Sequence, residues 1–222
     1  MKKLFFFLLT ILIGIHLFAY GSILFYRAFY PHKTVFMQWR MWQTKSQVAL
    51  QYQPIPYHSI PDRFKRAVIA SEDARFAQHD GFDWEGIQAA LRKNERKGTI
   101  KAGGSTISQQ LAKNLLLTPH RNFLRKGEET VITSILESTT HKDRILDLYL
   151  NVIEWGDGIY GVESAAQYYF HHSANHLSNQ EAARLASMIN RPTFYQTHPQ
   201  SKALRHKQNI IQRRMKKATL PD

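Results

Sequence analysis

The chain has 222 residues, 43% of them hydrophobic and 21% charged, which is typical of a globular protein and excludes a disordered or low-complexity chain. This length suits one domain with a single core, or one domain with a small appendage. Lysine and arginine outnumber aspartate and glutamate by 30 to 17, an excess that favours anionic lipid, nucleic acid or a phosphate-bearing substrate as partner. Cysteine is absent, which excludes disulfides, thiolate catalysis and cysteine-ligated metals.

The first predicted element is a transmembrane helix within residues 1–30. Residues 4–26 contain no Asp, Glu, Lys or Arg, and a run of about 20 apolar residues is enough to cross a bilayer as a helix. A cleaved signal peptide is the alternative, but the run is longer than a signal core and no small-residue cleavage site follows it. Tyr20, Tyr26, Phe29 and Tyr30 are typical of a membrane surface.

The charges beside this segment set its expected orientation. Lys2 and Lys3 favour a cytoplasmic amino terminus, although Arg27 and Lys33 follow on the other side. A long carboxyl-terminal domain can be translocated despite its charge. We therefore predict a single-pass protein with a short cytoplasmic stub and its body outside the cytoplasm.

The rest of the chain divides into a connector, residues 31–57, and one domain, residues 58–222. In the domain, apolar residues recur at helical spacing and strand-like alternation is scarce, which predicts a mainly α fold. Helices are predicted to begin near Pro61, Asp83, His141, Ser178 and Ser201, and two others are predicted to carry Ile107 and Val131. Gly98 is the predicted stop of the second. Ser178 and Glu181 form a capping-box pattern, and the last helix, 201–218, is strongly basic.

Three polar clusters interrupt these helical patterns. Residues 72–81 begin with Glu72 and Asp73, which could equally be a solvated helix end. Residues 103–114 place two glycines before a hydroxyl-rich helix start, an arrangement that suits anion binding by backbone N–H groups but is common in loops. Residues 121–129 carry three cations followed by two glutamates, and an ordinary ion pair between Arg125 and Glu129 explains that spacing equally well.

Taken together, the clusters suggest a class of reaction. Two carboxylates flanking a sugar bond are the usual equipment of glycoside chemistry. Neighbouring lysines and arginines suit a phosphate leaving group, which they stabilise as it departs. Spacing and chemistry alone leave the substrate open.

The order of the motifs resembles the glycosyltransferase domain of bacterial cell-wall synthases. The matching patterns are Glu-Asp-x-x-Phe-x-x-His-x-Gly, Gly-Gly-Ser-Thr-Ile-x-Gln-Gln-x-x-Lys-Asn and Arg-Lys-x-x-Glu, followed by residues 142–151 and 156–170. The resemblance covers residues 60–199. The family it indicates is glycosyltransferase family 51, which includes the glycosyltransferase domain of class A penicillin-binding proteins. The short chain leaves no room for a transpeptidase domain, so we expect the monofunctional biosynthetic peptidoglycan transglycosylase type.

This resemblance implies a lysozyme-like fold with a cleft that opens toward the membrane, and a location in the cell inner membrane with the catalytic domain in the periplasm. The implied substrates are lipid II and the growing glycan strand, with cell-wall or division proteins as further partners. Glu72 matches the general base, which deprotonates the acceptor sugar, and undecaprenyl diphosphate leaves with inversion. Glu129 matches the second catalytic glutamate.

The resemblance also implies a set of substrate-binding residues. Lys113, Arg121 and Arg125 match cations around the diphosphate; Thr106, Gln110 and Asn114 match polar cleft positions; Phe76 and His79 support the first motif. No tightly bound cofactor is expected, and Mg²⁺ or Mn²⁺ would be held by diphosphate and carboxylate together. No histidine pattern predicts a metal site. The last motif, 188–192, departs from the family pattern because it lacks the expected Leu-Pro start.

Two alternatives remain at this point. A lysozyme-like hydrolase would share the fold and one catalytic glutamate, but it has no diphosphate for the cations to stabilise. A non-enzymatic, membrane-anchored scaffold would explain the charge and the anchor but not the ordered glutamates. Nucleic-acid binding is not expected of an exported domain.

Overall fold

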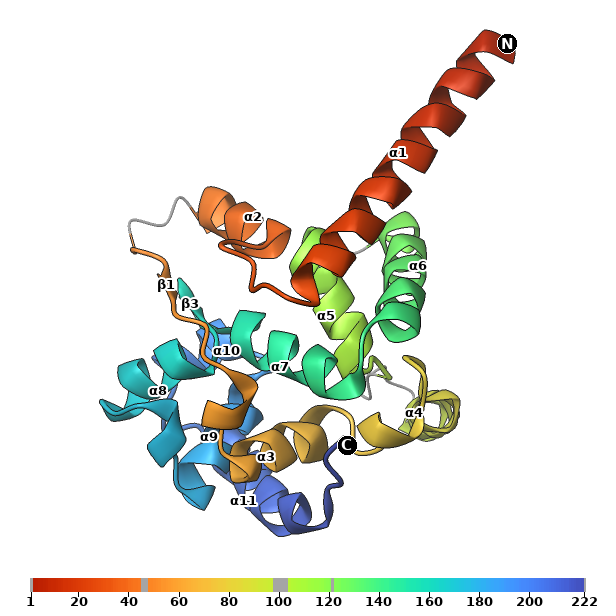
Figure 1. Ribbon diagram of the computed structural model, residues 1–222. Helices are drawn as coiled ribbons and strands as arrows, with labels where there is room; N and C mark the ends of the chain where they lie inside the picture. Colours follow the sequence, from red (N-terminus) through yellow and green to blue (C-terminus); the bar gives the residue numbers. More distant parts are fainter. Residues whose placement is uncertain (1, 45–47, 98–103, 121, 222) are drawn as a thin grey trace.

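The computed structural model describes residues 2–44, 48–97, 104–120 and 122–221. Helices predominate there, which confirms the predicted mainly α fold (Figure 1). They are α1 (Lys2–Tyr26), α2 (Val35–Thr44), α3 (Asp62–Glu72), α4 (Trp84–Lys97), α5 (Ile107–Leu116), α6 (Phe123–Thr139), α7 (Lys142–Val152), α8 (Val162–Phe170), α9 (Asn179–Met188), α10 (Pro192–Thr197) and α11 (Lys202–Arg214). Single 3₁₀ turns are η1 (Tyr57–Ser59), η2 (Phe76–Gln78), η3 (Ala174–His176) and η4 (Met215–Lys217).

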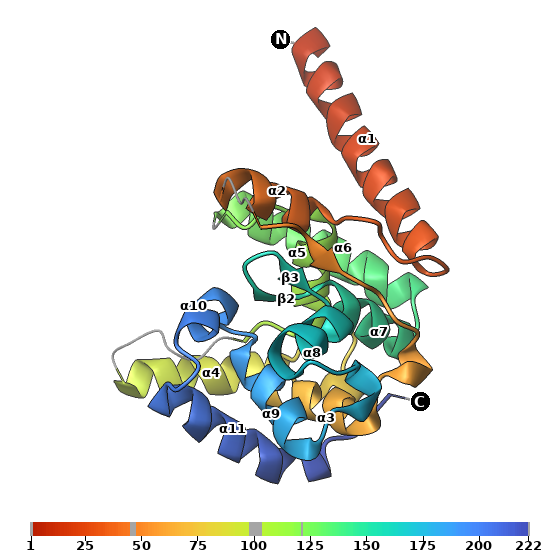
Figure 2. The same ribbon diagram turned by 90° about the vertical axis from the view of Figure 1, so that its left-hand side faces the viewer.

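Helix α1 projects away from the rest of the molecule (Figures 1 and 2). It has 25 residues and is apolar enough to cross a membrane, by length and composition, as the sequence predicts. Most of its side chains are exposed, whereas Ala19 and Ile23 in its carboxyl-terminal half are buried. The helix contacts α6. Its end is therefore seated on the body while its beginning stands clear.

The body is organised around α7, which lies in its middle in Figure 1. Every residue of this helix from Ile145 to Val152 is buried, so α7 is covered on several sides. It packs against α5, α6 and α8. Helix α3 packs against α9 and α11, and these three form the end of the body away from α1 (Figure 1).

A small sheet joins the residues after α2 to this body. Its strand order is β1-β3-β2: β1 (Gln51–Tyr52) pairs in parallel with β3 (Ile159–Tyr160), and β2 (Glu154–Gly156) pairs antiparallel with β3. Gly161 follows β3 with φ +81°, and an added Cβ would lie 2.5 Å from the carbonyl oxygen of Asn151, so glycine is required. The predicted connector thus carries both β1 and α2, and α2 buries Phe36 and Met37.

Several helix ends follow the predicted signals. Ser178 and Glu181 form the predicted capping box of α9. Asp83 accepts the backbone N–H of Gly86 at 3.0 Å at the start of α4, as expected of a cap. The basic helix α11 ends at Arg214 and tightens into η4, earlier than the predicted end at residue 218. The predicted stop of α4, Gly98, lies outside the described residues.

Candidate active site

Glu72 is the last residue of α3, and its carboxylate is held by groups from three helices. The Ser71 hydroxyl donates to Oε1 at 2.6 Å, and Nε2 of Gln110 on α5 donates to Oε2 at 3.3 Å. Nζ of Lys207 on α11 lies 3.3 Å from Oε1. The Glu72 side chain is only 10% exposed. Two neutral donors and one cation therefore orient a carboxylate that is largely withdrawn from water.

The orientation of Gln110 is set by Tyr149 from the buried helix α7. The Tyr149 hydroxyl donates to Gln110 Oε1 at 2.9 Å, which turns the amide nitrogen toward Glu72. Burial raises the pKa of Tyr149 well above its ordinary value, and the charges of Glu72 and Asp73 add to this rise. The hydroxyl therefore stays protonated and remains a donor to Gln110.

Asp73 connects the first polar cluster, residues 72–81, with the start of α5 in the second. Its buried carboxylate accepts His79 Nε2 at 3.0 Å and the backbone N–H of Ile107, the first residue of α5, also at 3.0 Å. A carboxylate at a helix amino terminus is favoured by the helix dipole and satisfies an otherwise unpaired N–H. The glycine-led helix start, which from the sequence suits an anion, thus already holds a carboxylate of the chain itself.

Thr106 and Phe76 are both buried and hold the loop after α3 in place. Thr106 caps α5 through a capping box with Gln109, and its hydroxyl donates to the carbonyl oxygen of Gly81 at 2.7 Å. Gly81 has φ +89°, a conformation that favours glycine. The ring of Phe76 lies 4.6 Å from Nζ of Lys142. These contacts position the loop that carries Asp73 and His79.

Glu129 lies on α6. Among the described residues, none contacts the side chains of both Glu129 and Glu72. Glu129 is 3% exposed. Its Oε2 accepts a hydrogen bond from Nη1 of Arg125 at 2.7 Å, and its Oε1 forms an ion pair with Nζ of Lys126. Asn122 caps α6 by accepting the backbone N–H of Arg125 at 2.7 Å. The ion pair that the spacing left open is therefore present, and a second cation joins it.

The remaining predicted residues lie on α5 or outside the described part of the chain. Nζ of Lys113 lies 5.6 Å from the ring centre of Phe36 on α2. Nδ2 of Asn114 donates to the carbonyl oxygen of Gln110 at 2.8 Å, which explains its burial. Arg121 is outside the described residues. Since α5 packs against α6, the helices of Lys113 and Arg125 are neighbours.

Sequence reasoning missed Lys207, which it included only as part of the strongly basic last helix. No spacing rule connects residue 207 with residue 72. A weaker signal was available, because Lys207 lies one turn from both Leu204 and Ile211, which are buried on the inner face of α11. A cation on the apolar face of a helix needs a partner, and here that partner is Glu72.

The donor set at Glu129 does not fit a divalent cation. Both carboxylate oxygens are already taken by Arg125 and Lys126, whose charges would repel a metal ion. The described residues also contain no group of three or more histidines and carboxylates that could hold one. The positive charge of this site is supplied by side chains.

Comparison with known proteins agrees with this picture. The family described as Transglycosylase matches residues 40–216. The biosynthetic peptidoglycan transglycosylase of Neisseria gonorrhoeae is 51% identical, over 97% of this chain and 95% of its own length. The protein of the same name from Neisseria meningitidis serogroup C (strain 053442) is also 51% identical with the same coverage, and that of Laribacter hongkongensis is 48% identical over 96% and 95%.

The matched segment contains α3, α5, α6, α7 and α11, the helices that carry both glutamates and their contacts. It confirms the predicted lysozyme-like glycosyltransferase domain, which here follows one apolar amino-terminal helix. The chain therefore belongs to the transglycosylase family and is a peptidoglycan glycosyltransferase of the biosynthetic type.

Proposed function

We propose that the enzyme polymerises lipid II, a disaccharide-pentapeptide on undecaprenyl diphosphate, into β-1,4-linked glycan strands. The observation that carries this proposal is the environment of Glu72, a nearly buried carboxylate oriented by donors from α3, α5 and α11. An oriented carboxylate of this kind is suited to accept a proton from a sugar hydroxyl. The apolar helix α1 supports a substrate that is itself anchored in a membrane.

In the proposed reaction, Glu72 accepts the proton of the acceptor's 4-hydroxyl. The acceptor oxygen forms a bond to the anomeric carbon of the donor strand while the bond from that carbon to the diphosphate oxygen breaks. The configuration inverts, and undecaprenyl diphosphate leaves with the bonding electrons. Ser71 and Gln110 fix the direction of the carboxylate. Lys207 places a positive charge beside the carboxylate and holds one of its oxygens.

We assign the leaving diphosphate to the cations near α5 and α6. Charge-assisted hydrogen bonds from lysine and arginine stabilise a phosphate that gains negative charge. Glu129 holds Arg125 and Lys126 together on one face of α6, ready to receive it. Lys113 on the adjacent helix, and Arg121 by its match to the family motif, complete the proposed set. No step of this scheme uses a metal ion.

The same proposal sets the location of the enzyme. Helix α1 would cross the inner membrane with Lys2 and Lys3 in the cytoplasm, and the body would lie in the periplasm. In this arrangement the site meets the head groups of lipid-linked substrates at the membrane surface. Contacts with other cell-wall or division proteins follow only from the family resemblance.

The test is polymerisation of labelled lipid II by the detergent-solubilised full chain. Wild type is expected to form long glycan products that lysozyme digests, and a folded Glu72→Gln variant is expected to form none. Cleavage of preformed glycan by a wild type that makes no polymer would instead support the lysozyme-like hydrolase. Binding of glycan without any turnover would support the scaffold.

A further inference from the structure

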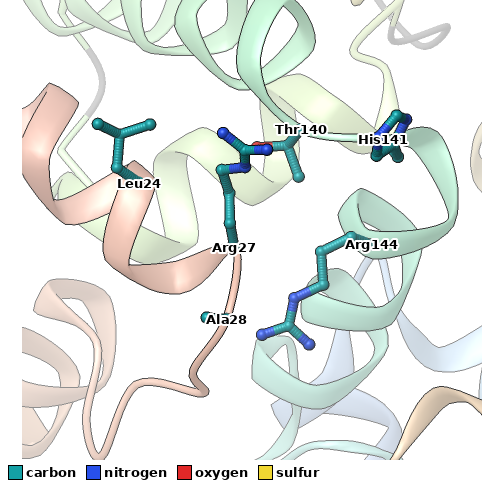
Figure 3. Close-up of a pocket in the computed structure, with 6 residues that line it drawn as sticks. All are labelled: Leu24, Arg27, Ala28, Thr140, His141 and Arg144. Atoms are coloured by element: carbon teal, nitrogen blue, oxygen red, sulfur yellow. The ribbon is translucent and has the colours of Figure 1, made fainter.

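A hollow of about 450 Å³ lies where the end of α1 meets the corner between α6 and α7 (Figure 3). Its lining residues are Leu24, Arg27, Ala28, Thr140, His141 and Arg144. A second hollow of about 480 Å³ shares four of these residues, including Leu24 and Arg27, and reaches Tyr20 one turn further along α1. We call the two adjoining hollows the anchor groove.

The wall between α1 and α7 is held rigidly by Arg144. Its Nη2 donates to the carbonyl oxygens of Tyr26 at 2.8 Å and Phe29 at 3.0 Å, and its Nη1 pairs with Asp147. Asp147 also accepts the Tyr30 hydroxyl at 2.8 Å. These bonds fix the segment from Tyr26 to Tyr30 against α7, so the anchor groove is formed before any ligand arrives.

Arg27 supplies the positive charge of the anchor groove. Its guanidinium points toward Thr140, whereas that of Arg144 points away toward the segment it holds (Figure 3). Among the described residues, no carboxylate pairs with the Arg27 side chain. Glu137 lines the second hollow, but its carboxylate is paired with Lys142 at 2.7 Å and accepts the Ser108 hydroxyl. The charge of Arg27 is therefore left to face the groove.

The other wall of the anchor groove is apolar. Tyr20 and Leu24 are four residues apart on one face of α1 and are 43% and 37% exposed. They belong to the helix that is apolar enough to cross a membrane. The groove thus has a cation at the end of α1 and apolar side chains along the membrane-spanning direction. An anionic head group with an attached hydrocarbon chain matches both parts.

We propose that the anchor groove binds an anionic phospholipid of the surrounding membrane. Its phosphate would lie at Arg27, beside Thr140 and His141, and one acyl chain would lie against Leu24 and Tyr20. Cations near an anionic membrane surface attract such head groups. This site is separate from Glu72 and does not depend on the proposed polymerisation.

The test is native mass spectrometry of the full-length chain in neutral detergent, titrated with phosphatidylglycerol or phosphatidylcholine. Arg27→Gln is expected to weaken phosphatidylglycerol binding about fivefold, the contribution typical of one cation, and to leave phosphatidylcholine binding unchanged. Arg27→Lys should keep most of the affinity. The matched control is Arg63→Gln, which removes an arginine from a hollow of about 460 Å³ on α3, at the end of the body away from α1.

Thermal unfolding of each variant verifies its fold. The proposal is wrong if Arg27→Gln binds phosphatidylglycerol as well as wild type does, or if Arg63→Gln weakens binding equally. Inorganic phosphate serves as a separate competitor. If inorganic phosphate displaces phosphatidylglycerol with an affinity equal to that of the lipid, the groove binds anions without using its apolar wall. The proposed contact of the acyl chain with Leu24 and Tyr20 would then be wrong.

Discussion

Glu72 and Glu129 both lie on helices, and their side chains are 10% and 4% exposed, yet the protein holds them in different ways. Glu72 receives one cation and two neutral donors, which come from α3, α5 and α11. Glu129 receives two cations, both from the first turns of its own helix. Both oxygens of Glu129 are thus occupied by cations, whereas the Glu72 carboxylate also receives neutral donors. The contrast supports the proposed roles, which are proton transfer for Glu72 and the arrangement of positive charge for Glu129.

The largest expected effect comes from moving the Glu72 carboxylate while keeping its charge. Glu72→Asp withdraws the oxygens by one methylene, and a displacement of about 1 Å in a reacting group can lower a rate about 100-fold. We expect the polymerisation rate to fall by about this factor while the melting temperature stays close to that of wild type. An equal loss of rate in Glu129→Asp would remove the distinction between the two glutamates.

Glu129→Gln should act mainly on stability. It leaves Arg125, whose side chain is 14% exposed, without its carboxylate partner, and breaking such a pair costs about 3 kcal/mol. Denaturant unfolding measures this loss of unfolding free energy. The neighbouring Glu128→Gln is the control, because Glu128 is exposed and its change should stay within about 0.5 kcal/mol. Similar losses in both variants would contradict the structural role of Glu129.

Lys207→Met should lower the polymerisation rate about tenfold, since a hydrogen bond to a charged group is worth about 1.5 kcal/mol or more. Lys207→Arg keeps the cation beside Glu72 and should restore most of the rate. The turnover number, measured at saturating lipid II, is the informative quantity. Equal defects in the methionine and arginine variants would show that Lys207 acts through packing and not through its charge.

The smallest effect is expected from Tyr149→Phe, which removes the hydroxyl that orients Gln110. It should cost about 1 kcal/mol of unfolding free energy and reduce the polymerisation rate only a few-fold. Burial raises the pKa of Tyr149 in the folded protein. The contribution of its hydroxyl to the unfolding free energy is therefore complete below the ordinary tyrosine pKa of about 10, and it is lost as the pH rises above that value. Unfolding of the phenylalanine variant should therefore depend less on pH in that range.

Local signals made much of the fold predictable from the sequence. The apolar run before Arg27 predicts α1, and the pattern of Ser178 and Glu181 predicts the start of α9; both are confirmed. These features depend on residues within a few positions of each other. The order of the motifs was equally informative, because the family match covers the segment that carries them.

Contacts between distant segments were not predictable in the same way. Lys207 meets Glu72 across 135 positions of the chain, and Asp73 reaches the start of α5 across 34. Neither pairing has a periodic signature, because each depends on how whole helices pack. The start of α5 is a similar case: the sequence shows a helix start that suits an anion, but only the packed structure shows that Asp73 occupies it.

The most direct test of the assignment of Glu72 as base is chemical rescue. In Glu72→Ala the carboxylate is removed and a small space is left, so added formate can accept the proton in its place. We predict that formate restores part of the polymerisation rate of Glu72→Ala and leaves the rate of Glu129→Ala unchanged. Recovery of Glu129→Ala, with no recovery of a folded Glu72→Ala, would contradict the account and exchange the roles of the two glutamates.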